Sequence, residues 1–177
     1  MRIDAIAEID LTQAEDARIR ALLDRAFGVD AGYCGRSYHK QRHHLRLMAY
    51  DGGTLLGHLA LLFRVIAMGD RAVPIIGIAE VATDPAHRGR GIATALLQAA
   101  IARSRATTAE FILLFGDRPI YAGLGFLPKT CTIRYLEMEG GTSSQVHTRV
   151  EPATRVMALQ ETTWDDAALI DLAGPIF

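Results

Sequence analysis

The segment from Asp84 to Ala93, DPAHRGRGIA, carries residue types suited to binding a phosphate or pyrophosphate. Gly89 and Gly91 let the backbone approach a ligand closely and adopt positive φ angles at little cost. An apolar helical pattern follows, so the segment lies at a helix N-terminus, whose unpaired N–H groups favour an anion. Arg88 and Arg90 add positive charge at the same place. An ordinary basic turn between a strand and a helix is the alternative interpretation.

Two common phosphate-binding patterns do not fit this segment. A dinucleotide fingerprint needs G-x-G-x-x-G, but Gly91 is followed by Ile92, Ala93 and Thr94. A P-loop needs G-x-x-x-x-G-K-[ST], which the chain lacks. The sequence therefore predicts neither a nicotinamide nor a nucleoside triphosphate as the ligand.

Two motifs instead resemble those of the GCN5-related N-acetyltransferases, the GNAT superfamily. Residues 81–93 are similar to motif A of that family, whose R/Q-x-x-G-x-G/A core is matched here by Arg88, Gly89, Gly91 and Ala93. Residues 116–126, GDRPIYAGLGF, are similar to the family's later Y-x-x-x-G-F segment, with Tyr121 as its tyrosine. Either motif alone is moderately specific, whereas the two at this separation are strongly specific.

The resemblance implies an α/β (α+β) GNAT fold, in which helices flank a mixed sheet with a splayed parallel strand pair, as a single domain over residues 1–177. It implies acetyl-CoA as cosubstrate and no metal. The loop amides would hold the pyrophosphate, and the preceding strand would pair with the pantetheine while a main-chain amide polarises the thioester carbonyl. The residues implied in cofactor binding are Val81, Ala82, Thr83, Arg88, Gly89, Arg90, Gly91, Ile92 and Ala93.

Tyr121 occupies the position at which the family protonates the leaving thiolate. A phenol with a pKa near 10 is a reasonable proton donor to a thiolate of pKa near 8.5. The alternative is that its ring only packs beneath the cofactor.

Glu80 is a carboxylate in an otherwise apolar strand, one residue before the expected thioester site. Burying a charge there is costly unless it is paired or functional, and apolar surroundings would raise its pKa towards that of a useful general base. A structural carboxylate bonded to backbone or to an arginine is the alternative. Asp117 is a second candidate for the general base, or a cap of the following short helix. Some relatives use no side-chain base.

The acceptor is suggested by a narrower resemblance, to the aminoglycoside 2′-N-acetyltransferases and more distantly to the nodulation N-acyltransferases. In the aminoglycoside enzymes, acidic residues and the terminal carboxylate contact a polycationic sugar. The tail of this chain carries Asp165, Asp166, Asp171 and the Phe177 carboxylate, an acidic patch that would attract a cation, with an acidic tail in solvent as the alternative. Asp117, Asp171 and the Phe177 carboxylate are the residues expected to contact the substrate. The resulting hypothesis is direct acetyl transfer to a small amine in a ternary complex. A protein or peptide N-acetyltransferase, a longer acyl donor and a non-catalytic acyl-CoA sensor are the alternatives.

The remaining histidines and cysteines favour structural roles. His58 lies in an apolar strand pattern, which indicates a core or surface residue rather than a pocket residue. His39, His43 and His44 have a spacing that could bind metal on a helix. Because the basic residues Lys40, Arg42 and Arg46 lie among them and no acids are near, a solvated basic face is favoured instead. Cys34 and Cys131 form no C-x-x-C pair, so no zinc or redox motif is expected.

These residues must be positioned by a mixed set of helices and strands. Periodicity predicts helices over 12–27, 93–105 and 118–124, the first with a Thr12–Glu15 capping box. Hydrophobic runs predict strands over 45–51, 54–68, 72–83, 110–115, 131–138 and 154–160. The strand–helix–strand run through 72–115 predicts parallel pairing. Residues 28–43 and 139–150 are expected to be loops, and residues after 160 a tail.

The composition fits one folded domain and excludes several classes. The chain has 177 residues, of which 50% are hydrophobic and 22% charged, with a net charge of −1. This balance speaks against a disordered chain and a general nucleic-acid binder. No apolar run reaches the length of a membrane span, and the acidic N-terminus is unlike a signal peptide, so a cytoplasmic protein is expected. An edge strand and a tail leave a homodimer open.

Overall fold

The computed structural model describes residues 1–28, 30–139 and 141–177. It divides into two compact units, and strands β3 and β4 and helix α2 each contribute residues to both. Unit 1 consists of Met1–Leu62 and Ala79–Ile101, and unit 2 of Phe63–Ile78 and Ala102–Phe177. The hydrogen-bonded strand order is β1-β2-β3-β4-β5-β7-β6-β8.

Unit 1 is built on antiparallel strands. β1 pairs with β2, and β2 pairs with the first part of β3 through a hairpin at Gly52 and Gly53. The elements that supply this unit are β1 (Arg2–Ala7), η1 (Glu8–Asp10), α1 (Gln13–Phe27), β2 (Leu45–Asp51), β3 (Thr54–Met68), β4 (Arg71–Thr83), η2 (Pro85–His87) and α2 (Ile92–Ser104). β1 was not among the predicted strands, because its short, half-exposed sequence RIDAIA carries a weak pattern.

Helix α1 begins and ends where its capping residues predict. The Thr12 hydroxyl accepts the Glu15 N–H at 3.3 Å, and the Glu15 carboxylate accepts the Thr12 N–H at 2.9 Å, which completes the capping box. Gly28 ends the helix with a φ of 90°. The buried face of α1 packs on β2, β3 and β4 through Ile19, Leu22 and Leu23 against Met48, Tyr50, Leu55 and Ala82.

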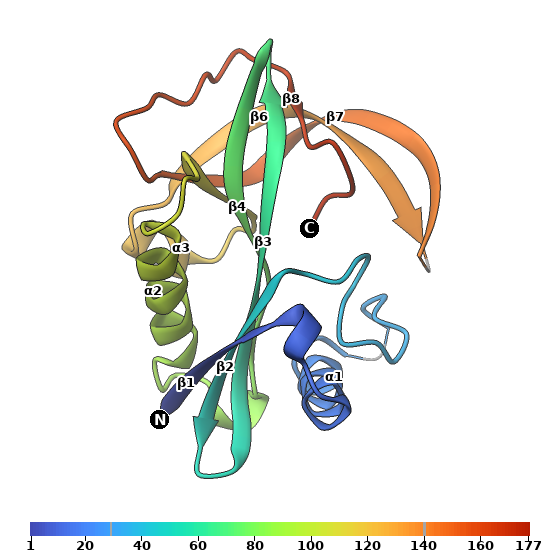
Figure 1. Ribbon diagram of the computed structural model, residues 1–177, viewed down its shortest axis with the longest axis vertical. Coiled ribbons are helices and arrows are strands. Elements are labelled where there is room, and N and C mark those ends of the chain that lie inside the picture. The colour runs from blue at the N-terminus through green and yellow to red at the C-terminus, as the bar shows by residue number, and fades with distance from the viewer. Residues whose placement is uncertain (29, 140) are drawn as a thin grey trace. The chain divides into compact units, whose positions relative to one another are not determined.

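Helix α2 packs on the other face of these strands at Gly57. A Cβ at Gly57 would lie 2.5 Å from Ile92 Cγ2 and 3.0 Å from Leu96 Cδ1, so only glycine admits the helix this close. Gly57 pairs with Ala49, whereas neighbouring Met48 packs against α1, and successive residues of a strand face opposite ways. The two helices therefore cover opposite faces of unit 1 (Figure 1).

Unit 2 contains the parallel pair and a long hairpin. β5 (Phe111–Phe115) pairs in parallel with β4 over Ile75–Ile78 and antiparallel with β7 (Thr142–Ala158). β7 pairs with β6 (Leu127–Glu139), and the short β8 (Ile170–Asp171) pairs with β6 and with the end of β3. α3 (Pro119–Gly123) connects β5 to β6. Parallel pairing of β4 and β5 around α2 confirms the predicted strand–helix–strand unit.

The expected loop over residues 139–150 is wrong for most of its length, with residue 140 outside the described residues. Residues 142–150 form the first part of β7 and pair with β6 from Thr132 to Glu139. This part of β7 is exposed on both faces. Its sequence therefore lacks the alternation of apolar and polar residues that indicates a half-buried strand. The strand predicted over 154–160 is the end of the same β7, and the expected tail contains β8. Of the expected loop over 28–43, residue 29 lies outside the described residues; the others form turns and bends.

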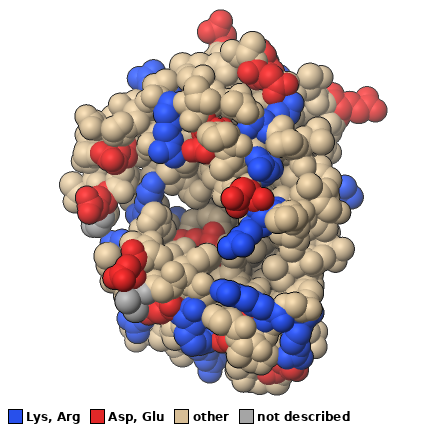
Figure 2. Space-filling model, turned by 180° about the vertical axis from the view of Figure 1, so that it is seen from behind, with Lys and Arg blue, Asp and Glu red and all other residues tan. Residues whose placement is uncertain are grey.

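Charged side chains of both signs are interspersed on the face seen in Figure 2. None of the helices in the described part of the chain is long and apolar enough to cross a membrane.

Candidate functional site

The predicted pyrophosphate loop of unit 1 is an exposed turn held at its base. The Asp84 carboxylate accepts the Ala86 N–H at 3.0 Å and pairs with Arg25 of α1 at 2.9 Å. Arg88 donates to the carbonyl oxygen of Ala26 at 3.2 Å, so this side chain also contacts α1. These contacts fix the start of the loop and leave residues 88–91 exposed.

The loop leads directly into the N-terminus of α2. Gly89 and Gly91 have φ angles of 76° and 75°, which L side chains rarely adopt. No described atom lies within 4 Å of a Cβ built on either glycine, so there is room for a ligand against this backbone. The first intrahelical bond runs from the Ala95 N–H to the Gly91 carbonyl, and the N–H groups of Ile92 and Ala93 precede it and have no acceptor in the helix. The arrangement can hold an anion.

The predicted donor strand, β4, changes conformation at Glu80. Its parallel ladder with β5 ends at the pair Ile78 and Leu114, while the strand continues to Thr83. Glu80 has a φ of 55°, an unusual value for a residue with a side chain and one that re-aims the strand. Val81, Ala82 and Thr83 follow this break as the last residues of the strand, with Ala82 packed in the core of unit 1.

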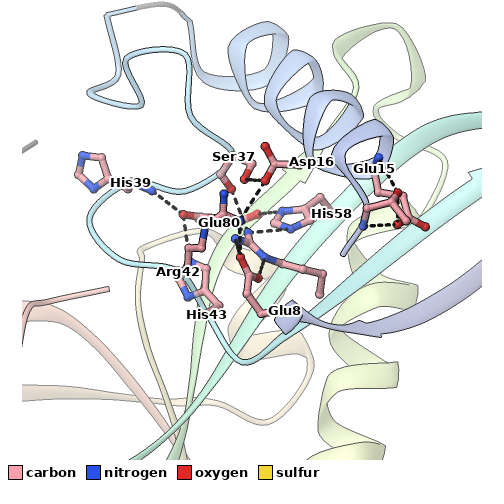
Figure 3. A network of polar contacts seen from close by, with 11 residues as sticks. Glu8, Glu15, Asp16, Ser37, His39, Arg42, His43, His58 and Glu80 are labelled. Atoms are coloured by element: carbon pink, nitrogen blue, oxygen red, sulfur yellow. Dashed lines mark hydrogen bonds and ion pairs between the residues drawn. The ribbon is translucent and has the colours of Figure 1, made fainter. Parts of the chain in front are cut away.

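Glu80 belongs to a buried polar cluster centred on Arg46, whose side chain is fully buried (Figure 3). Arg46 binds Glu8 through two nitrogens, at 2.6 and 3.1 Å, and donates to Glu80 Oε2 at 3.0 Å. Arg42 pairs with Glu8 at 2.8 Å and with Asp16 at 3.1 Å. We call this set the Arg46 cluster; its members are Glu8, Asp16, Ser37, Arg42, His43, Arg46, His58 and Glu80.

The carboxylate of Glu80 is saturated with donors. Oε2 accepts from Arg46, and Oε1 lies 3.0 Å from His43 Nε2 and accepts the backbone N–H of His39 at 2.8 Å. Burial raises the pKa of Glu80, but the hydrogen bond and charge of His43, with His58 and Arg46, outweigh it, and the pKa is lowered. The expectation that apolar surroundings raise this pKa is therefore wrong, because the surroundings are polar and basic.

His58 is a neutral core histidine, one of the two roles expected for it. Burial, followed by the charge of Arg46, lowers its pKa to about 3. Arg46 can only donate, so His58 Nε2 accepts from it at 3.3 Å and Nδ1–H donates to the Glu80 carbonyl oxygen at 3.2 Å. That second bond ties down the backbone of Glu80 at its unusual φ angle.

The expected solvated face of His39, His43 and His44 is wrong for His43. Its side chain is only 7% exposed and contacts Glu80, whereas His39 and His44 are exposed. Arg46, grouped with the basic residues of that face, is the centre of the buried cluster. Sequence spacing within residues 39–46 could not reveal this, because the acidic partners lie on η1, α1 and β4. Among the described residues, no group of three His, Cys, Asp or Glu could hold a metal ion.

Tyr121 lies in unit 2, on α3, in a closely fitted setting. A Cβ at Gly116 would lie 2.8 Å from Tyr121 Cε2, so the ring packs on bare backbone. Phe126 meets the ring edge-on at a centroid distance of 6.1 Å. Burial raises the pKa of Tyr121, aided by Asp117, so the phenol is protonated at neutral pH and can donate a proton.

The three candidate acceptor residues of unit 2 have different surroundings. Asp117 is exposed; within the described residues no side chain caps α3, which begins after Arg118, so the capping alternative is not what is seen. Asp171 accepts the Ala173 N–H at 2.9 Å and lies 3.7 Å from Arg134. The Phe177 ring packs on Phe115 at 5.2 Å and under the Arg64 guanidinium. Asp166 of the acidic tail pairs with Lys129.

The comparisons with known proteins decide the family. Residues 9–128 match the family model described as an acetyltransferase (GNAT) domain. The chain belongs to the GNAT family of acetyltransferases. No curated protein sequence is detectably similar to it.

Solved GNAT structures share the fold of this GNAT chain. A GNAT acetyltransferase from Brucella melitensis in complex with acetyl-CoA is 21% identical, with a TM-score of 0.59 over 96% of this chain and 94% of that one. YhbS from Escherichia coli in complex with CoA is 22% identical, with a TM-score of 0.65 over 97% and 88%. An acyl-CoA N-acyltransferase from Pseudomonas aeruginosa is 20% identical, with a TM-score of 0.61 over 89% and 99%. The predicted fold class is confirmed.

Proposed function

We propose that residues 1–177 form one catalytic domain that transfers an acetyl group from acetyl-CoA to the primary amine of a small molecule, in a ternary complex. The observation that carries the proposal is the exposed loop with its two left-handed glycines and free amides at the start of α2. This loop suits the pyrophosphate of CoA, and motif A of the family lies on it.

The donor would bind along the end of β4 and the start of α2. The backbone of Gly89, Gly91, Ile92 and Ala93 would hold the pyrophosphate, with Arg88 and Arg90 supplying charge. Val81, Ala82 and Thr83 would pair with the pantetheine as an added strand would, and an amide there would polarise the thioester carbonyl. In support, these three residues lie beyond the β4–β5 ladder.

Tyr121 would protonate the CoA thiolate as it leaves. Its raised pKa keeps the phenol protonated at neutral pH, as a proton donor must be.

The acceptor that we favour is an aminoglycoside or another amino sugar, approaching as a cation. Asp117 has the strongest support among the acceptor residues because it is exposed. Asp171 would contact the amine only after leaving Arg134, and the Phe177 carboxylate would reach it beside a ring that packs under Arg64. Glu80 is held by Arg46 and the His39 N–H and its pKa is lowered, so we propose for it the role of a structural carboxylate rather than of a general base.

Thiol release from acetyl-CoA tests the proposal. Purified protein is assayed with kanamycin, glucosamine and a short peptide with a free N-terminus, and acetyl-CoA binding is measured by calorimetry. We expect release with an amino sugar, and about 100-fold weaker acetyl-CoA binding in Gly91→Trp, because the indole would fill the pyrophosphate site. Release with the peptide alone would favour a protein acetyltransferase. Binding without release would favour an acyl-CoA sensor. Unchanged affinity in Gly91→Trp would show that the donor site lies elsewhere.

A further inference from the structure

Arg64, in the part of β3 that belongs to unit 2, binds the segment that follows β8. Its Nη1 donates to the carbonyl oxygen of Leu172 at 3.2 Å and to that of Pro175 at 2.7 Å. The guanidinium also lies against the backbone of Gly174, where an added Cβ would be 3.4 Å from its Cζ and Nη1. The Phe177 ring packs under the same guanidinium, with 5.4 Å between Cζ and the ring centroid. A single side chain therefore contacts this segment at several points.

Backbone hydrogen bonds hold the same residues, 172–177, to β6, and we call them the C-terminal segment. The Leu136 N–H donates to the Gly174 carbonyl oxygen at 2.9 Å, and the Leu172 N–H donates to the Arg134 carbonyl oxygen at 2.8 Å. The end marked C in Figure 1 accordingly lies inside the curve of the β6–β7 hairpin. β3 and β6 together give the C-terminal segment a defined position.

The Phe177 ring meets Phe115, the last residue of β5. The two ring centroids are 5.2 Å apart, with an angle of 59° between the ring planes. Both rings are partly buried at the edge of the core of unit 2, so each keeps an accessible surface. Ligand sites are lined mainly by apolar and aromatic side chains, and such rings offer a large surface for packing.

Phe115 and the proposed acid Tyr121 lie on opposite faces of the end of β5. The Gly116 N–H continues the ladder with β7 by donating to the Ala153 carbonyl oxygen at 2.8 Å, so strand alternation extends one residue past Phe115. The Tyr121 ring packs where a Cβ of Gly116 would stand. Because successive residues of a strand face opposite ways, the Phe115 side chain points away from Tyr121.

We propose that Phe115 and Phe177 form the subsite for the part of the acceptor that does not react, and that Arg64 is the positioning residue of this subsite. The inference rests on the proposed function, in which Tyr121 protonates the leaving sulfur. Since the acid occupies one face of the end of β5, the amine approaches from the other face, where the two rings lie. The subsite fits the saturated ring of an amino sugar, because an uncharged ring is not repelled by the guanidinium beside it.

The test uses two amines that differ in the ring: glucosamine and glucosaminitol, which is glucosamine opened by reduction. kcat and KM are measured by thiol release in the wild type, Phe177→Leu and Arg64→Met, and acetyl-CoA affinity by calorimetry. Leucine keeps an apolar side chain at position 177 and removes the aromatic face. In both variants we expect KM for glucosamine to rise about tenfold, with kcat within about twofold. KM for glucosaminitol and acetyl-CoA affinity should change by less than about twofold.

Arg71→Met is the matched control, since Arg71 is an arginine of unit 2 that pairs with Glu110 at 2.6 Å. Its kinetic constants should stay within about twofold of the wild-type values. Hydrogen exchange of the Leu136 N–H reports on the C-terminal segment without any substrate, because this group donates to Gly174. We expect its exchange to be faster in Arg64→Met and unchanged in Arg71→Met.

The outcomes separate this inference from the proposed function. An equal loss with both amines, or a fall in kcat at constant KM, would indicate a merely structural role and overturn the inference. Unchanged kinetics in Phe177→Leu would overturn the subsite, and unchanged exchange of Leu136 in Arg64→Met would overturn the positioning role; both would leave the acetyltransferase proposal intact. Thiol release with a peptide and with neither sugar would also overturn the subsite. Release with no amine at all would overturn the proposed function and this inference with it.

Discussion

At the scale of single residues, Arg46 determines more of unit 1 than any residue of the recognised motifs. Its guanidinium is fully buried and joins Glu8 from the N-terminal 3-10 helix to Glu80 in β4, with Ser37 and His58 completing its bonds. Removing one member of a buried ion-pair group leaves uncompensated charge, which costs far more than losing an exposed pair.

Arg46→Met should therefore lower the free energy of unfolding by about 3–5 kcal/mol. The matched control is Arg134→Met, whose partner Asp171 lies 3.7 Å away in an exposed pair, and which should cost at most about 1 kcal/mol. Urea unfolding followed by circular dichroism measures both. Equal losses in the two variants would contradict a structural role for the Arg46 cluster.

Residue chemistry was predictable from the sequence only where a short motif encodes it. The glycines of the loop were found because their spacing is local, and the structure gives both of them positive φ angles. Glu80 was singled out because a carboxylate is conspicuous in an apolar strand. Its partner Arg46 lies 34 positions earlier and was grouped with an exposed basic face, since pairing across strands leaves no trace in local spacing.

At the scale of elements, the position of α2 depends on the absence of a side chain at Gly57. Ile92 and Leu96 of the first turns of α2 occupy the space that a Cβ would take, and the Ala82 carbonyl oxygen lies 3.3 Å from it. The contact links the start of α2 to β3, which lies beside it. Packing of this kind is not flexible, because protein interiors are close to crystal density.

Gly57→Ala should therefore destabilise the protein by about 1–3 kcal/mol through overpacking. It should also weaken acetyl-CoA binding, because α2 must move at its N-terminus. Gly53→Ala is the matched control, because a Cβ at Gly53 would have no described atom within 4 Å other than those of its chain neighbours. We expect this variant to keep both its stability and its affinity for acetyl-CoA. The midpoints of urea unfolding measure the stability of the two variants, and calorimetry measures their affinity for acetyl-CoA. A stable Gly57→Ala with normal affinity would contradict the tight contact.

Gly116 has the same relation to Tyr121 in unit 2. Gly116→Ala places a methyl group 2.8 Å from the ring carbon Cε2, so the phenol must shift. We expect kcat to fall at least about tenfold with little change in acetyl-CoA affinity, as for Tyr121→Phe, if the phenol protonates the thiolate. Gly123→Ala, with open space at its Cβ, is the control. Full activity in Tyr121→Phe would show that the ring only packs.

Element boundaries were predictable wherever one face is buried, and failed where neither is. The hairpin of β2 and β3 and helix α1 follow their predicted bounds closely, because buried stripes and caps mark them. The exposed first part of β7 and the short β1 and β8 carry no such pattern. These strands are defined by their backbone hydrogen bonds to neighbouring strands, and the types of their side chains do not indicate those bonds.

At the scale of the whole molecule, acid should act on stability through the buried polar groups rather than through the net charge of −1. The pKa of His58 is about 3 in the folded chain and near 6.5 in an unfolded one, so the unfolded state binds more protons between these values. The pKa values of Glu8, Asp16 and Glu80 are also lowered. Their stabilisation is present above their ordinary pKa values and is lost as the pH falls through the folded ones.

The free energy of unfolding should therefore be nearly flat above pH 7 and fall by up to about 1.4 kcal/mol per pH unit below pH 6.5 from His58 alone. His58→Gln should remove this slope between pH 6.5 and pH 5, leaving the carboxylate transition at lower pH. Urea titrations at half-unit intervals of pH measure both profiles. Parallel slopes in the two proteins would show that His58 is not the group responsible.

The division of the chain into residues 1–62 with 79–101, and 63–78 with 102–177, has a consequence for synthesis on the ribosome. Every residue of unit 1 has been made once the chain reaches Ile101, whereas unit 2 requires the last residues. The Arg46 cluster and the predicted pyrophosphate loop are therefore complete in the growing chain before Tyr121, the proposed acid, is added to it.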